Sequence, residues 1–150
     1  MFKSSVIVAA FLAGLICGVA TSGRAEDWAV STVRSYHIER KDYEESNLGL
    51  GIETDLSQRL RLSVGVYRNS ERRDSAYGVL VYCPLSLRYG SWRGCGLAGG
   101  VTGYSESIAP LAGGVLSYEG KRYGVNVIWF PNKRGDFTEG VLAFQLKKRF

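Results

Sequence analysis

Apolar and polar residues alternate with a period of two along most of the chain after Glu26. This alternation places successive side chains on opposite faces of a strand and predicts β-structure. We expect strands at residues 28–37, 47–56, 59–68, 76–85, 92–104, 110–118, 122–130 and 139–150. Short and longer polar connections alternate between them, as in outer-membrane barrels. The pattern predicts an all-β fold, an eight-stranded antiparallel up-and-down outer-membrane β-barrel with both chain ends at the periplasmic side.

The alternation separates an apolar face from a face of small and polar residues. We expect the apolar face to meet lipid tails, and it carries Leu48, Leu50, Ile52, Leu60, Leu62, Val64, Val66, Val79, Val81, Leu142, Phe144, Leu146 and Phe150. A soluble binding barrel would turn this face inward instead. Aromatic residues near the strand ends favour the membrane arrangement, and they are Trp28, Tyr67, Tyr104 and Trp129.

Glycine recurs on the other face, which we expect to line the lumen, although it weakens a strand. One interpretation is that these glycines relieve crowding and let a small barrel bend. The other is that they clear a tube for a slender apolar guest such as an acyl chain. The second interpretation assigns to this tube Gly49, Gly51, Ser63, Gly65, Gly96, Ala98 and Gly100.

The first 25 residues have the pattern of a secretory signal peptide. Lys3 is followed by an apolar segment at residues 6–19 and by the small-x-small signal Gly23-Arg24-Ala25. We expect cleavage before Glu26, which leaves one transmembrane barrel domain at residues 26–150. At the other end, a strand that closes on Phe150 resembles the sorting signal of outer-membrane barrels.

Charge and cysteine content narrow the function. Without Lys3 and Arg24 the chain has 17 basic and 14 acidic residues, a balance that does not predict nucleic-acid binding. Cys83 and Cys95 fall on one face by parity, so they are disulfide candidates in a compartment that permits the bond. Two cysteines and one histidine fall short of the usual four ligands, so we expect neither a metal site nor a cofactor. We expect a monomer.

Candidate chemistry lies where the first and third strands end. His37, the only histidine, ends the first strand, and Asn69-Ser70 ends the third, so both lie at the outer-loop end. A serine hydroxyl becomes a nucleophile when a base such as histidine takes its proton. Asn69 would orient the histidine or stabilise an oxyanion. Other outer-loop serines offer alternatives to Ser70, namely Ser46, Ser75, Ser105 and Ser107.

The outer loops are also rich in charge. One interpretation is ordinary solvated loop chemistry. The other is that basic side chains hold the phosphates of lipid A, since guanidinium groups bind phosphate oxygens bidentately. The candidates are Arg68, Arg72, Arg73, Lys133 and Arg134.

The three prolines lie at strand ends. Pro84 closes the fourth expected strand, Pro110 opens the sixth and Pro131 follows the seventh. They either punctuate the strands or mark a lateral opening, because proline donates no hydrogen bond to the sheet.

Several short segments occur in an order that resembles a known family. They are Asp27-Trp28, Gly49-Leu50-Gly51, Val66-Tyr67-Arg68-Asn69-Ser70, Gly99-Gly100-Val101-Thr102, Pro110-Leu111, Phe130-Pro131-Asn132 and Ala143-Phe144-Gln145. Over most of the chain after residue 26 they resemble the lipid A palmitoyltransferases of the PagP type. The resemblance implies a small outer-membrane enzyme that moves palmitate from a phospholipid donor to lipid A, with catalytic positions at His37, Asn69 and Ser70.

The chain departs from the family pattern at two places. Asn69 replaces the aspartate of the family's Asp-Ser pair and carries no negative charge. Asp74-Ser75 keeps the literal dipeptide but lacks the preceding aromatic and basic residues. We expect the family's N-terminal helix to be absent or very short, because His37 comes about twelve residues after the expected cleavage site.

The leading expectation is therefore an outer-membrane acyltransferase. The alternative from another class is a non-enzymatic small barrel that binds lipid or supports the envelope. A lipid A deacylase of the same architecture is disfavoured, because no His-x-Ser segment lies on a late strand.

Overall fold

The computed structural model describes residues 26–38, 45–104, 107–131 and 140–150. The expected signal peptide at residues 1–25 lies outside this part of the chain. No helix among the described residues is long and apolar enough to cross a membrane.

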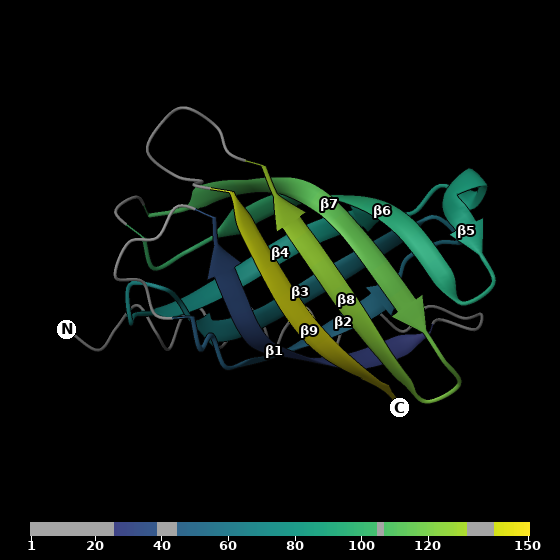
Figure 1. Ribbon diagram of the computed structural model, residues 1–150, viewed down its shortest axis with the longest axis horizontal. Helices are drawn as coiled ribbons and strands as arrows, with labels where there is room; N and C mark the ends of the chain where they lie inside the picture. Colours follow the sequence, from purple (N-terminus) through teal and green to yellow (C-terminus); the bar gives the residue numbers. More distant parts are fainter. Residues whose placement is uncertain (1–25, 39–44, 105–106, 132–139) are drawn as a thin grey trace.

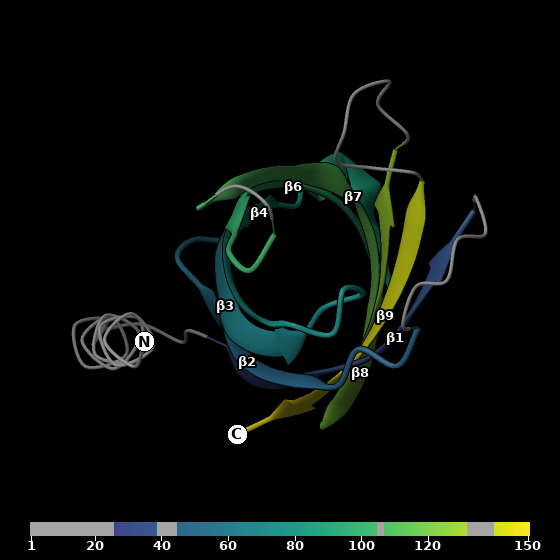
Figure 2. The same cartoon turned by 90° about the vertical axis from the view of Figure 1, so that its left-hand side faces the viewer.

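Eight antiparallel strands close into a barrel (Figures 1 and 2). They are β1 (Asp27–His37), β2 (Gly49–Asp55), β3 (Leu60–Arg68), β4 (Asp74–Tyr82), β6 (Trp92–Val101), β7 (Ala109–Glu119), β8 (Tyr123–Phe130) and β9 (Val141–Arg149). Each pairs with its neighbour, and the β1–β9 and β4–β6 pairings complete the ring. A short 3₁₀ turn, η1 (Leu85–Leu87), and the two-residue β5 (Arg88–Tyr89) lie between β4 and β6. The predicted all-β fold, an eight-stranded antiparallel barrel, is confirmed.

The barrel has two unlike ends. The start of β1 and the end of β9 share one end with the turns between β2 and β3 and between β7 and β8, and we call it the terminal end. The last residues of β1, β3, β6 and β8 lie at the opposite end, which we call the loop end (Figure 1).

Strand register corrects two of the predicted faces. Paired residues of antiparallel strands share a face, and β4 pairs Val79 with Gly99 and Val81 with Leu97. Both valines are 6% exposed and belong to the core inside the barrel, so the prediction that they meet lipid was wrong. By the same register, Gly96, Ala98 and Gly100 lie on the outward face, and their assignment to the lumen was also wrong. Both faces of these strands are apolar or small, so alternation alone did not distinguish them.

The glycines of β2 and β3 do face the lumen, but an aromatic ring covers them. A Cβ atom added at Gly51 would lie 2.6 Å from the Tyr77 hydroxyl, and one added at Gly65 would lie 2.7 Å from the Tyr77 ring. A Cβ atom added at Gly49 would instead meet the Cβ atom of Tyr67, its register partner on β3. These positions therefore relieve crowding around tyrosines, which is the first of the two interpretations, and they leave no open tube.

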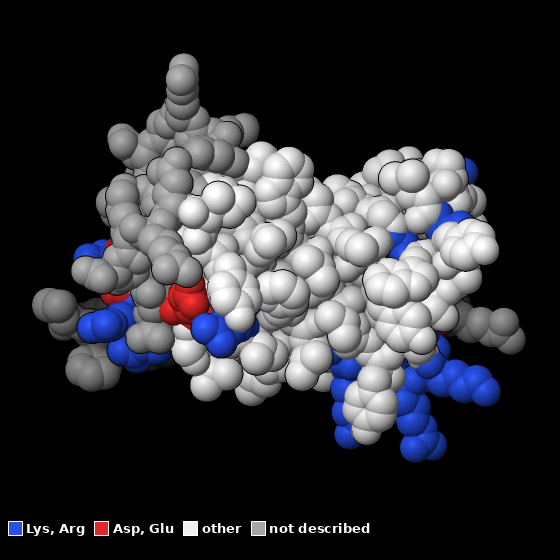
Figure 3. Space-filling model, viewed as in Figure 1, with Lys and Arg blue, Asp and Glu red and all other residues white. Residues whose placement is uncertain are grey.

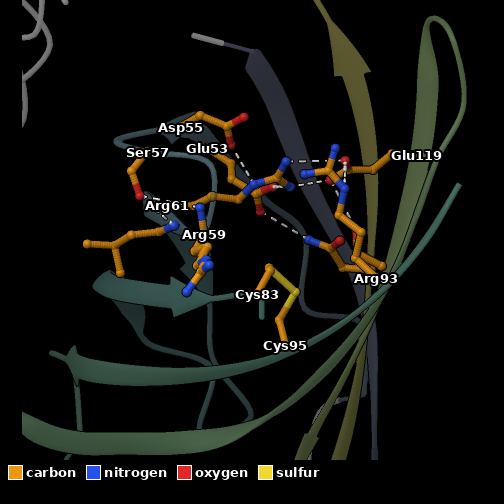
Figure 4. The surroundings of a disulfide bond; sticks show 12 residues. Glu53, Asp55, Ser57, Arg59, Arg61, Cys83, Arg93, Cys95 and Glu119 are labelled. Carbon is orange, nitrogen blue, oxygen red and sulfur yellow. Dashed lines mark hydrogen bonds and ion pairs between the residues drawn. A yellow bond between two sulfur atoms is a disulfide. The ribbon is translucent and has the colours of Figure 1, made fainter. Parts of the chain in front are cut away.

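The lumen near the terminal end is closed by charged side chains. Lys147 of β9 lies 3.0 Å from Glu53 of β2 and 2.7 Å from Glu119 of β7. Arg61 of β3 lies 3.0 Å from Glu53 and also pairs with Glu119. All four side chains are at most 4% exposed. We call them the lumen charge network; it ties β3 to β7 across the barrel (Figure 4).

The expected disulfide is present in this region. Cys83, which follows β4, is bonded to Cys95 of β6, and the bond lies close to the lumen charge network in Figure 4. It links β6 to the chain that leaves β4, beside the pairing that closes the ring.

We expect Lys147→Met to lower the free energy of unfolding by about 3 to 5 kcal/mol, because it leaves Arg61 as the one remaining cation of the network for two buried carboxylates. Lys148→Met is the matched control, since Lys148 is exposed on the outer face of the same strand. Urea unfolding in detergent micelles measures both. Equal losses of stability in the two variants would show that the network does not hold the barrel together.

Candidate functional site

An apolar cavity of about 150 Å³ occupies the lumen on the loop side of the charge network. Its walls are side chains of the buried cluster, including Val79, Val81, Leu97, Val115 and Ile128. The polar side chains of Glu53, Asn126 and Gln145 form its floor and join it to the charge network, with Asn126 donating to Glu53 at 3.3 Å. The cavity is therefore closed towards the terminal end.

His37 and Ser70 both line this cavity at the loop end. His37 ends β1, and Ser70 follows β3, which is the second strand over from β1. The structure thus brings the two predicted residues to the mouth of one apolar chamber. Of the seven positions expected to line an acyl lumen, Ser63 alone lines it.

A β-bulge in β1 turns His37 towards the lumen. Trp28, Val30 and Thr32 are buried at even positions, and regular alternation would carry this face on to even-numbered residues. The register with β9 shifts between Thr32 and Arg34, after which odd positions face inward and Ser35 is 7% exposed. A bulge adds one residue to a strand and redirects the side chains beyond it. Its effect here is to place the only histidine at the cavity.

The side chain of Asn69 is fully engaged in loop structure. Its Oδ1 atom accepts hydrogen bonds from the backbone N–H groups of Glu71 at 3.0 Å and Arg73 at 2.9 Å. Its Nδ2 group donates to Ser75 Oγ and to the Gly103 carbonyl, both at 3.0 Å. Asn69 is 0% exposed. The expectation that it orients His37 or stabilises an oxyanion is corrected, because no hydrogen-bonding capacity is left for either task.

This arrangement explains why an asparagine suits position 69. An aspartate at position 69 would have no N–H group to donate to the Gly103 carbonyl. The alternative dipeptide, Asp74-Ser75, does not face the cavity either. Ser75 is 3% exposed and accepts a hydrogen bond from Asn69, and Asp74 is exposed to solvent. Ser70 is therefore the serine of the pair that faces the cavity.

The predicted phosphate-binding residues are only partly described. Arg68, Arg72 and Arg73 are exposed at the loop end, and Arg73 lies 3.8 Å from Glu71. Lys133 and Arg134 lie outside the described residues, as does Ser105. The assignment of these arginines to the phosphates of lipid A stays a prediction.

The ladder between β7 and β8 is incomplete beside the cavity. It runs from Gly114 paired with Trp129 to Glu119 paired with Gly124, so Ala109–Gly113 of β7 have no β8 partner among the described residues. Pro110 lies in this stretch, and Ala109, Pro110 and Leu111 all line the cavity. Pro84 and Pro131 lie beyond strand ends, as punctuation would place them.

No family model and no curated protein matches this chain. Among solved structures, the chain resembles the solution NMR structure of the de novo designed TMB2.3, a designed transmembrane barrel, with a TM-score of 0.62 and 13% sequence identity. The match covers 87% of this chain and 97% of the designed one. At this identity the likeness establishes the barrel fold, which is compatible with placement in a membrane.

We expect Asn69→Asp and Asn69→Ala each to lower the free energy of unfolding by about 1 to 3 kcal/mol, because each leaves buried polar groups without partners. Ser70→Ala, the neighbouring control, should change it little, since Ser70 lines the cavity instead of holding the loop. Thermal and urea unfolding of the three variants provide the comparison. If Asn69→Asp were as stable as the unmodified protein, Asn69 would not have the structural role in the loop that we assign to it.

Proposed function

We propose that this protein is an outer-membrane acyltransferase that moves an acyl chain from a phospholipid to lipid A. The observation that carries the proposal is an apolar cavity inside the barrel whose mouth holds a histidine and a serine. A cavity lined largely by apolar side chains with a few polar groups at its opening suits an apolar guest with a polar end. An acyl chain with its ester at the mouth has this form.

The proposed chemistry needs only the residues at the mouth. His37 takes the proton from the Ser70 hydroxyl or from the acceptor hydroxyl, and the oxygen so activated attacks the ester carbonyl of the donor. The bond between the carbonyl carbon and the glycerol oxygen breaks, and the proton passes from His37 to that oxygen. If Ser70 is the nucleophile, the acyl group passes from its oxygen to lipid A in a second step.

The depth of the cavity sets the length of chain that it encloses. Lining residues span from Val141 to Gln145 on β9 and from Ala109 to Val115 on β7. At a rise of about 3.4 Å per residue and a strand tilt of about 45°, this spacing gives a depth of roughly 10 to 14 Å. An extended chain advances about 1.2 Å per bond. The cavity thus encloses roughly eight to twelve carbons, and we propose a donor chain of that length in place of palmitate.

Pro110 offers a route for the acyl chain, because it lines the cavity and donates no hydrogen bond to a neighbouring strand. The hydrocarbon tail would enter from the surrounding leaflet beside this residue. The exposed arginines at the loop end would then hold the phosphates of the acceptor. On this route the acyl chain stays in apolar surroundings, and the charged headgroups stay in water.

A second function, the binding of lipid without any reaction, has its own support. Asn69 faces loop backbone and does not stabilise a protonated histidine as the family's aspartate would. A barrel that holds an apolar guest without reacting with it would have the same cavity. The two functions differ in whether the mouth residues change a lipid.

Expression of the protein should add the mass of one acyl chain to lipid A, and His37→Ala should reduce this product about a hundredfold or more, as loss of a general base does. Mass spectrometry of lipid A from cells with and without the protein measures it. An unchanged lipid A would support the second function, and a product that survives His37→Ala would remove His37 from the mechanism.

Ala143→Leu should shorten the preferred chain by up to about three carbons, because the added side chain fills close-packed space that the guest would occupy. Ala143 lines the cavity, whereas Ala98 points outward and gives the matched control Ala98→Leu. Donors of graded chain length reveal the preference. If the outward substitution shifted the preference as far as the inward one, the lumen would not be the chain site.

A further inference from the structure

The outer surface of the barrel changes character at the terminal end. On β9 the outward side chains run from Phe144 and Leu146 to Lys148, and Lys148 pairs in register with Tyr123 of β8. Further round, the rings of Trp92 and Tyr118 pack with their centroids 5.1 Å apart. Exposed aromatic side chains of this kind lie at the headgroup level of a bilayer. The apolar belt of the barrel therefore ends at the row of aromatic side chains formed by Trp92, Tyr118 and Tyr123.

Beside this row, every exposed charged side chain among the described residues is basic. These residues, which we call the terminal cationic rim, are Arg59, Arg88, Lys121, Arg122 and Lys148. None of them makes an ion pair with any part of the chain that the structure describes. Figure 3 shows basic side chains projecting at the end of the barrel where the chain terminates.

The acidic residues of this end do not compensate the rim. Glu26 pairs with Arg149 at 3.0 Å and with Arg93 at 3.8 Å. Asp55 pairs with Arg61, and Asp27 accepts a hydrogen bond from Thr54. The remaining acidic side chains of this end, Glu53 and Glu119, belong to the lumen charge network. The field outside the barrel at this end is accordingly positive.

The loop end differs from the rim. Its exposed arginines alternate with acids, as in the run from Arg68 to Asp74, and Glu71 lies 3.8 Å from Arg73. Arg34 is likewise paired with Glu45 at 3.1 Å. Among the described residues, a ring of exposed side chains that are all basic therefore occurs at the terminal end and not at the loop end.

The distribution of the rim identifies its partner. Its residues come from the β2–β3 turn, the connection from β4 to β6, the β7–β8 turn and β9, so they encircle the barrel instead of forming one patch. A soluble polyanion would contact one side of such a collar, whereas lipid headgroups surround a barrel on all sides. Long basic side chains at the edge of an apolar belt reach the phosphates of the adjoining leaflet.

We propose that the terminal cationic rim binds the phosphates of anionic phospholipids in the leaflet at the terminal end of the barrel. This rests on the membrane placement within the proposed function and is independent of acyl transfer. Each basic residue near an anionic membrane surface strengthens the attraction about fivefold. Several such residues give a marked preference for anionic over zwitterionic lipid.

The test uses refolded protein in nanodiscs of phosphatidylcholine that contain a minority of spin-labelled phosphatidylglycerol or spin-labelled phosphatidylcholine. The protein should bind the anionic label several-fold more strongly. Replacing three residues together, as Lys121→Gln, Arg122→Gln and Lys148→Gln, should bring the ratio close to one. The control is Arg34→Gln at the loop end, where this exposed arginine pairs with Glu45, and it should keep the preference.

An equal affinity for both labels, or an unchanged preference in the triple variant, would overturn the proposal. So would an equal loss in the loop-end control. Release of the anionic label by added inorganic phosphate would identify a site for free anions and would also contradict a leaflet partner. Circular dichroism confirms that each variant is folded. His37→Ala should retain the preference, so failure of acyl transfer and failure of the rim are distinguishable.

Discussion

Four buried charges from four strands are the interaction on which the rest of this barrel depends. Lys147 and Arg61 share Glu53 and Glu119 in the lumen, where none of the four is more than 4% exposed. Taking ions out of water is costly, and mutual pairing offsets the cost only when all partners are held in place. Strand order and register supply that placement, since β3 and β7 face one another across the lumen.

The network also divides the lumen into two halves of different chemistry. The terminal half is filled with paired charges and closed beside the Cys83–Cys95 disulfide. The loop half is lined by aliphatic side chains and remains open space of about 150 Å³. An apolar guest can therefore be enclosed only from the loop end, and that is the end at which the bulge in β1 places His37.

Sequence pattern predicted the eight strands because most strands contrast polar with apolar positions. It failed on the faces of β4 and β6, where Val79 and Ala98 are both apolar and parity gives no direction. The pattern did not predict the bulge that redirects His37, because no residue type at positions 32–34 distinguishes a bulge from a regular strand. Alternation places Glu53 and Arg61 on the same strand faces as the lumen glycines Gly51 and Gly65. Lys147 stands beside Lys148 in the sequence, and only the register shows which of the two faces the lumen. The role of Asn69 was hidden because its partners, Ser75 and Gly103, come from other segments.

The central claim is that the loop half of the lumen encloses an alkyl chain and the terminal half does not. Nuclear Overhauser effects between the protein in decyl-chain detergent and the detergent alkyl protons test it most directly. The account predicts contacts from the lumen methyl groups of Leu97, Val115 and Ile128, and none from the side chains of Lys147 or Glu119. Alkyl contacts confined to outward residues such as Leu146, with the lumen methyl groups contacting water alone, would contradict it.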